Sequence, residues 1–307
     1  MNYSGIYPAF YAAYDSEGKI NLSAAKSYAK ILADCGVQGL YVGGSSGECI
    51  YQSVDERKRY LEGVVEAVGE RLEIIAHVAC NNTADSVELA SHASTLNIKA
   101  IAAIPPIYFH LSNTAIAAYW RAIAEAAPNL DFIIYNIPQL AGVSLSPALL
   151  ETMLEVPSVI GVKNSSMPVL DITEFLELGR KHRSDFIVFN GPDEQLVSGL
   201  AAGAAAGIGG TYGAFPELYL AIFAAFEAGD LERARRLQRH ANEYIRLLCH
   251  YSGNLYAVAK ALVRHRYGVD LGSVRAPLTA LSPSDESRLN ELFTLVDVII
   301  QEEGLDA

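Results

Sequence analysis

The sequence predicts an α/β fold: a closed (β/α)8 TIM barrel followed by a C-terminal helical extension. Short apolar runs recur at a nearly regular spacing from Ile6 to Tyr212. Segments with helical periodicity separate these runs, and alternating strands and helices are typical of a parallel sheet with right-handed crossovers. Eight such units within about 230 residues also match the usual barrel size of ~250 residues.

The predicted strands are continuously apolar, as expected for strands buried on both faces of a sheet. In chain order they are IYPAFYAAY from Ile6, GLYVGGS from Gly39, IIAHVA from Ile74, AIAAIPP from Ala100, FIIYNIP from Phe132, VIGVKNSS from Val159, FIVFNG from Phe186 and AAGIGGTY from Ala205.

Helical periodicity lies between the runs, for example in VDERKRYLEGVVEAV from Val54 and in PALLETMLEV from Pro147. The structural alternative is a doubly wound open sheet, which usually carries a phosphate-binding fingerprint after its first strand. The segment IYPAFYAAYDSEG contains neither GxGxxG nor GxxxxGK[ST]. The closed barrel is therefore favoured.

Three further helices are expected after the barrel. They are LERARRLQRHANEYIRLLCHY, NLYAVAKALVRHRYG and a last helix from about Ser284 to Ile300. No low-complexity linker precedes them. We therefore expect a catalytic barrel domain over residues 1–228 and a helical extension packed on it over residues 229–307.

The composition restricts the classes of function. The chain has 307 residues, of which 51% are hydrophobic and 19% charged, so it can form a large core and is not a disordered chain. A net charge of -12 argues against nucleic acid and against an anionic membrane as partners. An anionic substrate would have to be held by local donors, because the overall field repels it.

The cysteines and the N-terminal sequence predict a cytoplasmic protein. Cys35, Cys49, Cys80 and Cys249 are scattered and form no CxxC pair, which suits a reducing compartment. The start, MNYSGIYPAF, has neither the basic region nor the apolar stretch of a signal peptide. No run approaches the ~18 apolar residues that are needed to span a membrane.

Polar residues stand where the predicted strands end, and in a barrel these ends and the loops after them form the active face. The candidates are Ser45, Ser46, Glu48, Asn81, Asn82, Tyr108, Tyr135, Asn136, Lys163, Asn164, Ser165, Asn190, Asp193, Glu194 and Gly209 to Tyr212.

Lys163 ends the apolar run VIGVK, where a charged amine is costly. An ordinary lysine has a pKa of about 10.4, so almost none of it is neutral at pH 7. Desolvation lowers the pKa and gives a nucleophilic amine that can form an imine with a carbonyl. The alternative is a lysine that reaches the barrel mouth or pairs with a carboxylate there. Position alone leaves both open.

Tyr135 favours the first interpretation. It lies in FIIYN, at the same depth as Lys163 on the preceding strand. Its phenol can donate and accept a proton, so it could shuttle protons to a carbinolamine or a substrate hydroxyl. A tyrosine at a strand end is also a common amphipathic plug.

The segment YVGGSSGECI contains Ser45-x-x-Glu48, the spacing of a capping box, so a helix or helical turn is expected to start there. A helix N-terminus with flanking glycines also presents free backbone N–H groups that bind a carboxylate or phosphate. In this acidic protein, such a turn could hold an anionic α-keto acid.

Asp193 and Glu194 follow the seventh strand in NGPDEQL. They could simply stabilise the first turn of a helix, where carboxylates suit the dipole. They could also accept hydrogen bonds from a polyhydroxylated substrate.

The seven histidines form no HxH or HExxH pair, and no GxSxG segment is present. No metal site and no hydrolase nucleophile are therefore expected.

The segments GGSSGE, YNIP and GVKNS resemble the N-acetylneuraminate lyase and dihydrodipicolinate synthase family of class I aldolases. The resemblance covers essentially the whole chain. It implies a covalent imine on Lys163 with no other cofactor, and a proton relay through Tyr135, Ser46 and Tyr108, the last partly across a subunit interface. It also implies that the Ser45–Ser46 turn binds the pyruvate carboxylate, and that the protein is a homotetramer.

The lyase branch of the family is the closer one. The synthases carry an arginine two residues after YNxP, where this chain has Leu140, and tend to have two threonines where it has Ser45 and Ser46. HVACNNTADSVELA and NGPDE are also similar to the lyases. In that branch, positions matching Ser165, Gly191, Asp193 and Glu194 lie near the substrate.

Two positions depart from the lyases. This chain has GIGGTY where they often read GIGSTY, and the second hydroxyl of the turn comes from Ser46 where they usually have Thr. Gly210 therefore lacks a hydroxyl that would help to hold the sugar tail, and the aldehyde partner is less well defined.

The predicted reaction is cleavage of N-acetylneuraminate into pyruvate and N-acetylmannosamine. The alternatives are a sister aldolase acting on another 2-keto-3-deoxy acid, the dihydrodipicolinate synthase, and a non-catalytic barrel that senses a keto acid.

Overall fold

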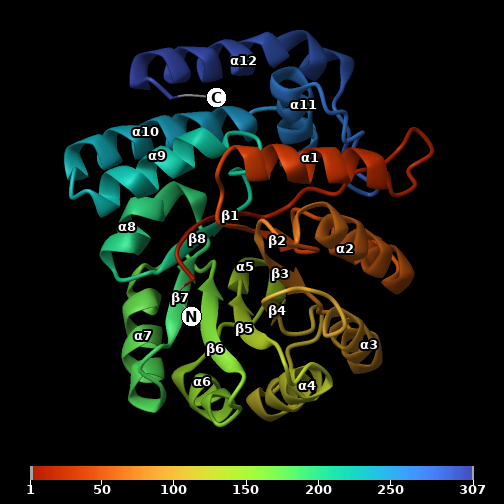
Figure 1. Ribbon diagram of the computed structural model, residues 1–307, viewed down its shortest axis with the longest axis vertical. Coiled ribbons are helices and arrows are strands. Elements are labelled where there is room, and N and C mark those ends of the chain that lie inside the picture. The colour runs from red at the N-terminus through yellow and green to blue at the C-terminus, as the bar shows by residue number, and fades with distance from the viewer. Residues whose placement is uncertain (1–2, 306–307) are drawn as a thin grey trace.

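Eight parallel strands form a barrel in the computed structural model, which describes residues 3–305 (Figure 1). The strands are β1 (Gly5–Pro8), β2 (Gly39–Val42), β3 (Glu73–His77), β4 (Ala100–Ala103), β5 (Asp131–Asn136), β6 (Val159–Asn164), β7 (Ile187–Asn190) and β8 (Ala206–Gly209). Their order is β1-β8-β7-β6-β5-β4-β3-β2. The barrel closes between β1 and β2, where the amide of Phe10 donates to Tyr41 O at 2.9 Å and that of Gln38 donates to Ile6 O at 3.0 Å. The predicted fold class is confirmed.

Helices surround the strands, as Figure 1 shows. They are α1 (Leu22–Asp34), η1 (Cys49–Tyr51), α2 (Val54–Val68), α3 (Thr83–Ala93), α4 (Asn113–Ala126), α5 (Pro138–Ala141), α6 (Pro147–Leu154), α7 (Leu170–His182), η2 (Asp193–Gln195), α8 (Leu196–Ala201) and α9 (Pro216–Glu227). None of the helices within residues 3–305 is long and apolar enough to cross a membrane.

The extension consists of α10 (Leu231–Leu248), α11 (Leu255–Tyr267) and α12 (Pro283–Glu303), close to the three segments predicted. Leu237 and Tyr244 of α10 and Leu262 of α11 are fully buried and belong to the same apolar cluster as the barrel helices. A shared core does not mark a domain boundary. The division into residues 1–228 and 229–307 therefore stays a prediction.

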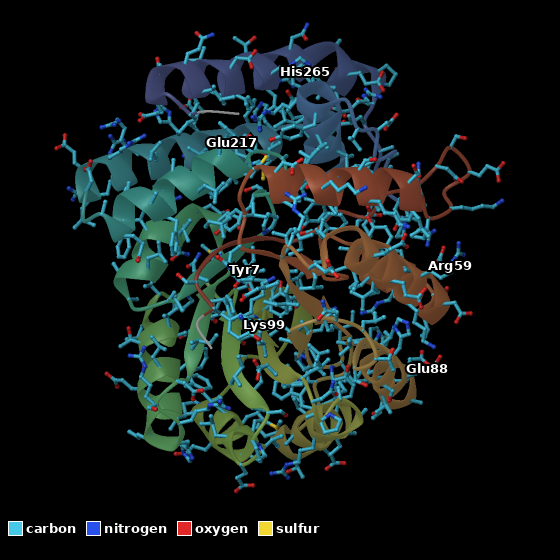
Figure 2. All side chains as sticks on the ribbon, in the orientation of Figure 1. Tyr7, Arg59, Glu88, Lys99, Glu217 and His265 are labelled. Carbon is cyan, nitrogen blue, oxygen red and sulfur yellow. The ribbon has the colours of Figure 1, made fainter. Side chains whose placement is uncertain are left out.

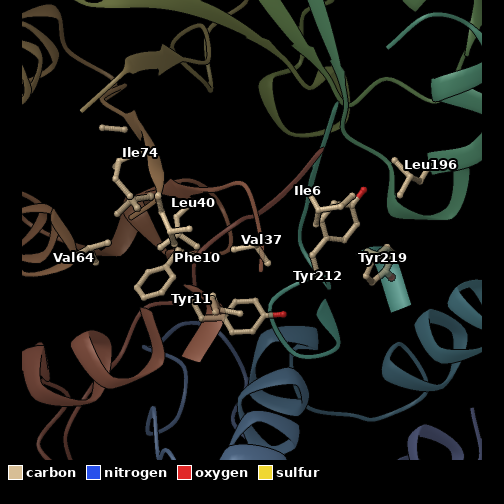
Figure 3. Packing of buried hydrophobic residues seen from close by; sticks show 14 of the residues in the cluster. Ile6, Phe10, Tyr11, Val37, Leu40, Val64, Ile74, Leu196, Tyr212 and Tyr219 are labelled. Carbon is tan, nitrogen blue, oxygen red and sulfur yellow. The ribbon is translucent and has the colours of Figure 1, made fainter. Parts of the chain in front are cut away.

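Side chains alternate along each strand between the barrel interior and the layer under the helices. In β2, Leu40 and Val42 point outward, whereas Tyr41 points into the barrel. Figure 3 shows part of the outer layer, including Ile6 and Ile74. Because both faces of every strand are covered, the strands read as continuous apolar runs.

The N-terminal end of the barrel interior is filled by polar contacts. The phenol of Tyr7 and the amine of Lys99 both bond the carboxylate of Glu73, and the phenol of Tyr3 donates to Asp131 at 2.8 Å. Tyr7 and Lys99 are labelled in the middle of the strand ring in Figure 2. These contacts close that end, which leaves the opposite end of the barrel for a site.

Candidate active site

Lys163 lies inside the barrel near the C-terminal end of β6. Only 4% of the residue is exposed, and its Nζ lies 4.0 Å from the ring centroids of both Tyr41 and Tyr135. No carboxylate within residues 3–305 comes within ion-pair distance of it. Burial lowers the pKa of Lys163 to about 7, and the charge of Asp193 opposes the shift only in part. A large fraction of the amine is therefore neutral at neutral pH.

Tyr135 of β5 is the direct strand neighbour of Lys163. Its ring is held edge-on between Tyr41, at 5.8 Å between centroids, and His77, at 6.1 Å. Burial raises the pKa of the Tyr135 phenol, while hydrogen bonding with Ser165 and Ser45 lowers it in part. The phenol therefore keeps its proton near neutral pH and is fixed beside the amine.

The turn after β2, residues 43–48, presents free donors. Gly43 adopts a φ of +77°, which favours glycine. Within residues 3–305, the amides of Ser45 and Ser46 donate to no protein acceptor, whereas the amides of Gly47 and Glu48 bond back to the turn itself. Two adjacent unpaired amides form a small concave donor site that suits a carboxylate.

The predicted capping box at Ser45 and Glu48 is wrong, although the expected turn is present over residues 45–48, with the amide of Glu48 donating to Ser45 O at 3.0 Å. Glu48 adopts a left-handed φ of 54°, η1 begins only after it at Cys49, and no side chain caps that short helix. The Glu48 carboxylate bonds Lys260 Nζ at 2.6 Å instead. The capping box of this region lies at Ser53 and Glu56, at the start of α2. Glu48 is drawn away because a buried cation offers a stronger partner than a backbone amide.

His77 supports the start of the turn, and no motif in the sequence singles it out. Its Nδ1 lies 2.9 Å from Gly43 O, and the amide of Ile104 lies 3.4 Å from its Nε2. Burial lowers the pKa of His77 well below its ordinary value, so the ring is neutral. Because a carbonyl can only accept, Nδ1 carries the proton and donates it to Gly43.

Asp193 holds the loop after β8. Its carboxylate accepts from the amide of Gly210 at 3.2 Å, from the amide of Thr211 at 2.7 Å and from the Thr211 hydroxyl at 2.6 Å. Burial raises the pKa of Asp193 to about 6, although the bonds from Thr211 oppose the shift. Glu194, in contrast, is exposed. The two neighbouring carboxylates therefore have different surroundings: one is bound to the loop and the other is free at the rim.

A cavity of about 310 Å³ joins these groups at the C-terminal ends of the strands. Ten of the residues selected from the sequence line it: Ser45, Ser46, Tyr135, Lys163, Ser165, Gly191, Asp193, Glu194, Gly210 and Thr211. At Gly191, a Cβ would lie 2.0 Å from Ser165 Oγ, so any side chain there would displace that hydroxyl.

The structure does not bring the other selected residues to the cavity: Glu48, Asn81, Asn82, Tyr108, Asn136, Asn164, Asn190, Gly209 and Tyr212. Among these, Tyr108 is the residue that was expected to take part in the proton relay. It does not line the cavity, is 86% exposed and has a φ of 85°. Its ring lies edge-on against that of Phe109, at 5.0 Å between centroids. A contribution of Tyr108 to the site of another subunit stays a prediction.

Residues of the extension also line the cavity, and sequence reasoning missed them. They are Ile245, Cys249, Leu255 and Tyr256. The phenol of Tyr256 lies 3.4 Å from the position that a Cβ on Gly210 would take. A signal was available: α11 carries Lys260, one turn after Tyr256, within the apolar stretch LYAVAKALV. A buried lysine on an apolar helix indicates a buried partner.

Larger hollows lie elsewhere among the described residues, of about 530 Å³ at the N-terminal end of the barrel, about 820 Å³ between α10 and α12, and about 520 Å³ beside Tyr14 and Arg275, where Arg275 is paired with Glu56. In the first, the amine of Lys99 is bonded to Glu73. In the second, Arg236 is paired with Glu303. None of these three hollows combines a buried amine without an ion pair, a phenol and free amides. No group of His, Cys, Asp or Glu within the described part of the chain could hold a metal ion.

Comparisons with known proteins agree with this arrangement. The model of the dihydrodipicolinate synthetase family matches residues 2–295. The chain is 53% identical over 294 residues to an N-acetylneuraminate lyase of Mediterraneibacter gnavus, covering 96% of this chain and 92% of that protein. It is 34% identical to an N-acetylneuraminate lyase of Escherichia coli, covering 99% of both. A solved structure described as a Ruminococcus gnavus sialic acid aldolase catalytic lysine mutant superposes with a TM-score of 0.95 at 51% identity, over 98% of this chain and 97% of that one.

Proposed function

Because the chain belongs to the dihydrodipicolinate synthetase family, we propose that it is an aldolase that cleaves N-acetylneuraminate into pyruvate and N-acetylmannosamine. The 53% identity to a relative named N-acetylneuraminate lyase supports this substrate. The observation that carries the mechanism is the buried Lys163 amine, with its pKa near 7, between two tyrosine rings and beside free amides. That combination suits imine formation with a keto acid.

The reaction begins when Lys163 Nζ attacks the C2 ketone of the open-chain sugar acid. Tyr135 donates a proton to the departing hydroxyl of the carbinolamine, and water leaves to give an iminium. The C4 hydroxyl loses its proton, the C3–C4 bond breaks, and its electron pair moves into the iminium to form an enamine. N-acetylmannosamine leaves with the new aldehyde. Protonation of the enamine at C3 and hydrolysis then release pyruvate and restore the amine.

The substrate carboxylate is proposed to bind the free amides of Ser45 and Ser46. Ser46 is buried, with 3% exposed, so its hydroxyl can join a relay from Tyr135 without competition from bulk water. The imine supplies the electron sink, and the proposal includes no metal and no organic cofactor. The proposed role of Lys163 is supported by a relative: the solved R. gnavus sialic acid aldolase is described as a catalytic lysine mutant, so that enzyme uses a lysine in catalysis.

The sugar tail is proposed to lie along Ser165, Gly191, Asp193 and Glu194, toward the cavity rim. Gly210 lacks a hydroxyl there, but the phenol of Tyr256 lies next to the space that a side chain at 210 would occupy. Tyr256 therefore supplies a hydroxyl from the extension in place of one from the β8 loop.

The proposed assembly is a homotetramer in the cytoplasm. Tyr108 and Phe109 form an exposed aromatic pair, with 86% and 71% exposed, and Ile50 is 58% exposed. A second copy of the chain would cover such an apolar surface. The cysteines are free, which suits a reducing compartment.

The alternatives find less support. A dihydrodipicolinate synthase would need a cation for the second carboxylate of its substrate, and Leu140 lies on the cavity where the synthases carry arginine. A keto-acid sensor has no use for an amine whose pKa lies near 7. A sister aldolase differs only in its aldehyde partner.

Borohydride reduction in the presence of pyruvate tests the chemistry. We expect a covalent adduct on Lys163, found by peptide mass spectrometry, and none in Lys163→Ala. A pyruvate-release assay over several sialic and 2-keto-3-deoxy acids tests the substrate, and N-acetylneuraminate should give the highest kcat/KM. Absence of an adduct would support the sensor, and turnover of only a shorter acid would support the sister aldolase.

A further inference from the structure

A buried ion pair lies directly behind the turn that presents the free amides. Glu48 and Lys260 are in contact at 2.6 Å, and their side chains are 0% and 1% exposed. They are far apart in the sequence and come from different parts of the molecule, since Glu48 ends the turn after β2 and Lys260 belongs to α11. The extension therefore reaches the turn through a buried contact of opposite charges.

Further bonds leave the Glu48 carboxylate little freedom. Its second oxygen accepts from the backbone amide of Arg275 at 2.8 Å, and Lys260 Nζ also donates to Ser273 O at 2.9 Å. The Arg275 guanidinium continues the network, donating to Tyr51 O at 2.7 Å and to both carboxylate oxygens of Glu56. The chain from the turn to the start of α2 is thus tied to the loop that follows α11.

The backbone of Glu48 is consistent with a residue that is held in place. A φ of 54° is rare for residues other than Gly, Asn and Asp. This conformation aims the side chain at Lys260 and away from Ser45. A strained backbone of this kind persists where surrounding contacts determine it.

The turn is consequently fixed at both ends, with the free amides between the two attachments. Its first residue, Gly43, is bonded to neutral His77, and its last, Glu48, is bonded to Lys260 and Arg275. Two amides bind a carboxylate well only if they keep one direction, because reorganisation would cost part of the binding energy.

We propose that Glu48 and Lys260 are positioning residues, which fix the direction of the Ser45 and Ser46 amides and thereby set the affinity of the site for the keto-acid carboxylate. They contact no substrate atom. The inference rests on the proposed function, because it concerns the binding of the same keto acid.

The rate of borohydride trapping, measured against pyruvate concentration, tests the inference. In Lys260→Met, we expect the half-saturating pyruvate concentration to rise by about tenfold or more, while the limiting rate stays within about threefold of the wild-type rate. Lys163 itself is unchanged, so only the binding of the carboxylate is weakened. In Glu48→Gln/Lys260→Met, no unpaired charge is buried, so this variant should fold even if the single one does not. It should still show the raised half-saturating concentration.

The chain offers a matched control on the same helix. Arg266 of α11 and Glu217 of α9, the latter labelled in Figure 2, form an ion pair at 2.9 Å with both side chains 7% exposed. Neither lines the cavity. Glu217→Gln/Arg266→Met should leave the half-saturating concentration within about twofold of the wild-type value, even if the melting temperature falls.

Three results would overturn the inference. They are a folded Glu48→Gln/Lys260→Met variant with the wild-type half-saturating concentration, a loss confined to the limiting rate, and an equal rise in the control. If the wild-type enzyme itself forms no adduct, the proposed function fails and the inference fails with it. The wild-type measurement therefore distinguishes the two.

Discussion

At the scale of single residues, the buried amine of Lys163 lowers the stability of the folded protein when it is charged. Burial lowers its pKa from 10.5 to about 7, so the folded protein resists protonation of this group. Below pH 7, the amine is charged in both the folded and unfolded states, and the full cost of a buried charge is present. Between about pH 7 and 10.5, only the unfolded state binds the proton, so the stability of the wild-type protein rises with pH in this window.

The first prediction follows from this rise of stability with pH. Lys163→Met should raise the free energy of unfolding by an amount on the order of a few kcal/mol at pH 6, and the gain should shrink as the pH rises toward 9. Denaturant unfolding of both proteins at pH 6, 7, 8 and 9 measures it. A gain that does not change with pH would mean that the amine is not desolvated in the folded protein.

A second prediction concerns Tyr256 and Gly210. Tyr256→Phe removes the phenol next to the open position at Gly210, so KM for N-acetylneuraminate should rise by about threefold to tenfold, with little change in pyruvate trapping. A Cβ at Gly210 would meet Ser46 Oγ and Tyr256 OH at 3.4 Å, so a serine fits there. Gly210→Ser in the Tyr256→Phe background should therefore recover part of the affinity. Steady-state kinetics of the three proteins check this, and no recovery would argue against a shared hydroxyl position.

At the scale of secondary-structure elements, the position of the capping box distinguishes two serines. Ser53 caps α2, with its hydroxyl accepting from Glu56 N at 3.2 Å, whereas Ser45 caps no helix. Ser53→Ala should lower the free energy of unfolding by about 0.5–2 kcal/mol. Ser45→Ala should change it by less than about 0.5 kcal/mol and act on the proton relay instead, because the Ser45 side chain is hydrogen-bonded to the Tyr135 phenol. Urea denaturation of both variants measures the two changes in stability. Equal losses of stability would contradict the assignment of the helix cap to Ser53.

The elements themselves were largely predictable from the sequence. Strands covered on both faces produce continuous apolar runs, and each of the runs contains a strand of the barrel. Lys163 and Tyr135 could be paired because parallel strands end at one edge. The capping box could not be placed, since the competing partner of Glu48 is Lys260, more than two hundred residues later. Tyr256 was missed for the same reason: no local pattern shows where a helix after the barrel will pack.

At the scale of the whole molecule, the exposed aromatic pair leads to a prediction about assembly. Tyr108 and Phe109 are largely exposed in the single chain, and the proposed homotetramer would bury them. Phe109→Asp should shift the protein to smaller species, because an interface tolerates an unpaired buried charge poorly. Sedimentation or light scattering measures the shift. A wild-type protein that is already a monomer would contradict the proposed assembly.

The closed N-terminal end of the barrel has a consequence for the order of events under the proposed reaction. Tyr7, Glu73 and Lys99 fill the N-terminal end of the barrel interior, and Lys163 lines a cavity that Glu194 also lines, so the substrate is expected to reach Lys163 through the mouth of that cavity. Seen from that mouth, the three-carbon fragment attached to Lys163 lies deeper in the cavity than the sugar fragment. The sugar must depart before pyruvate can be freed, and in the reverse direction pyruvate has to arrive first.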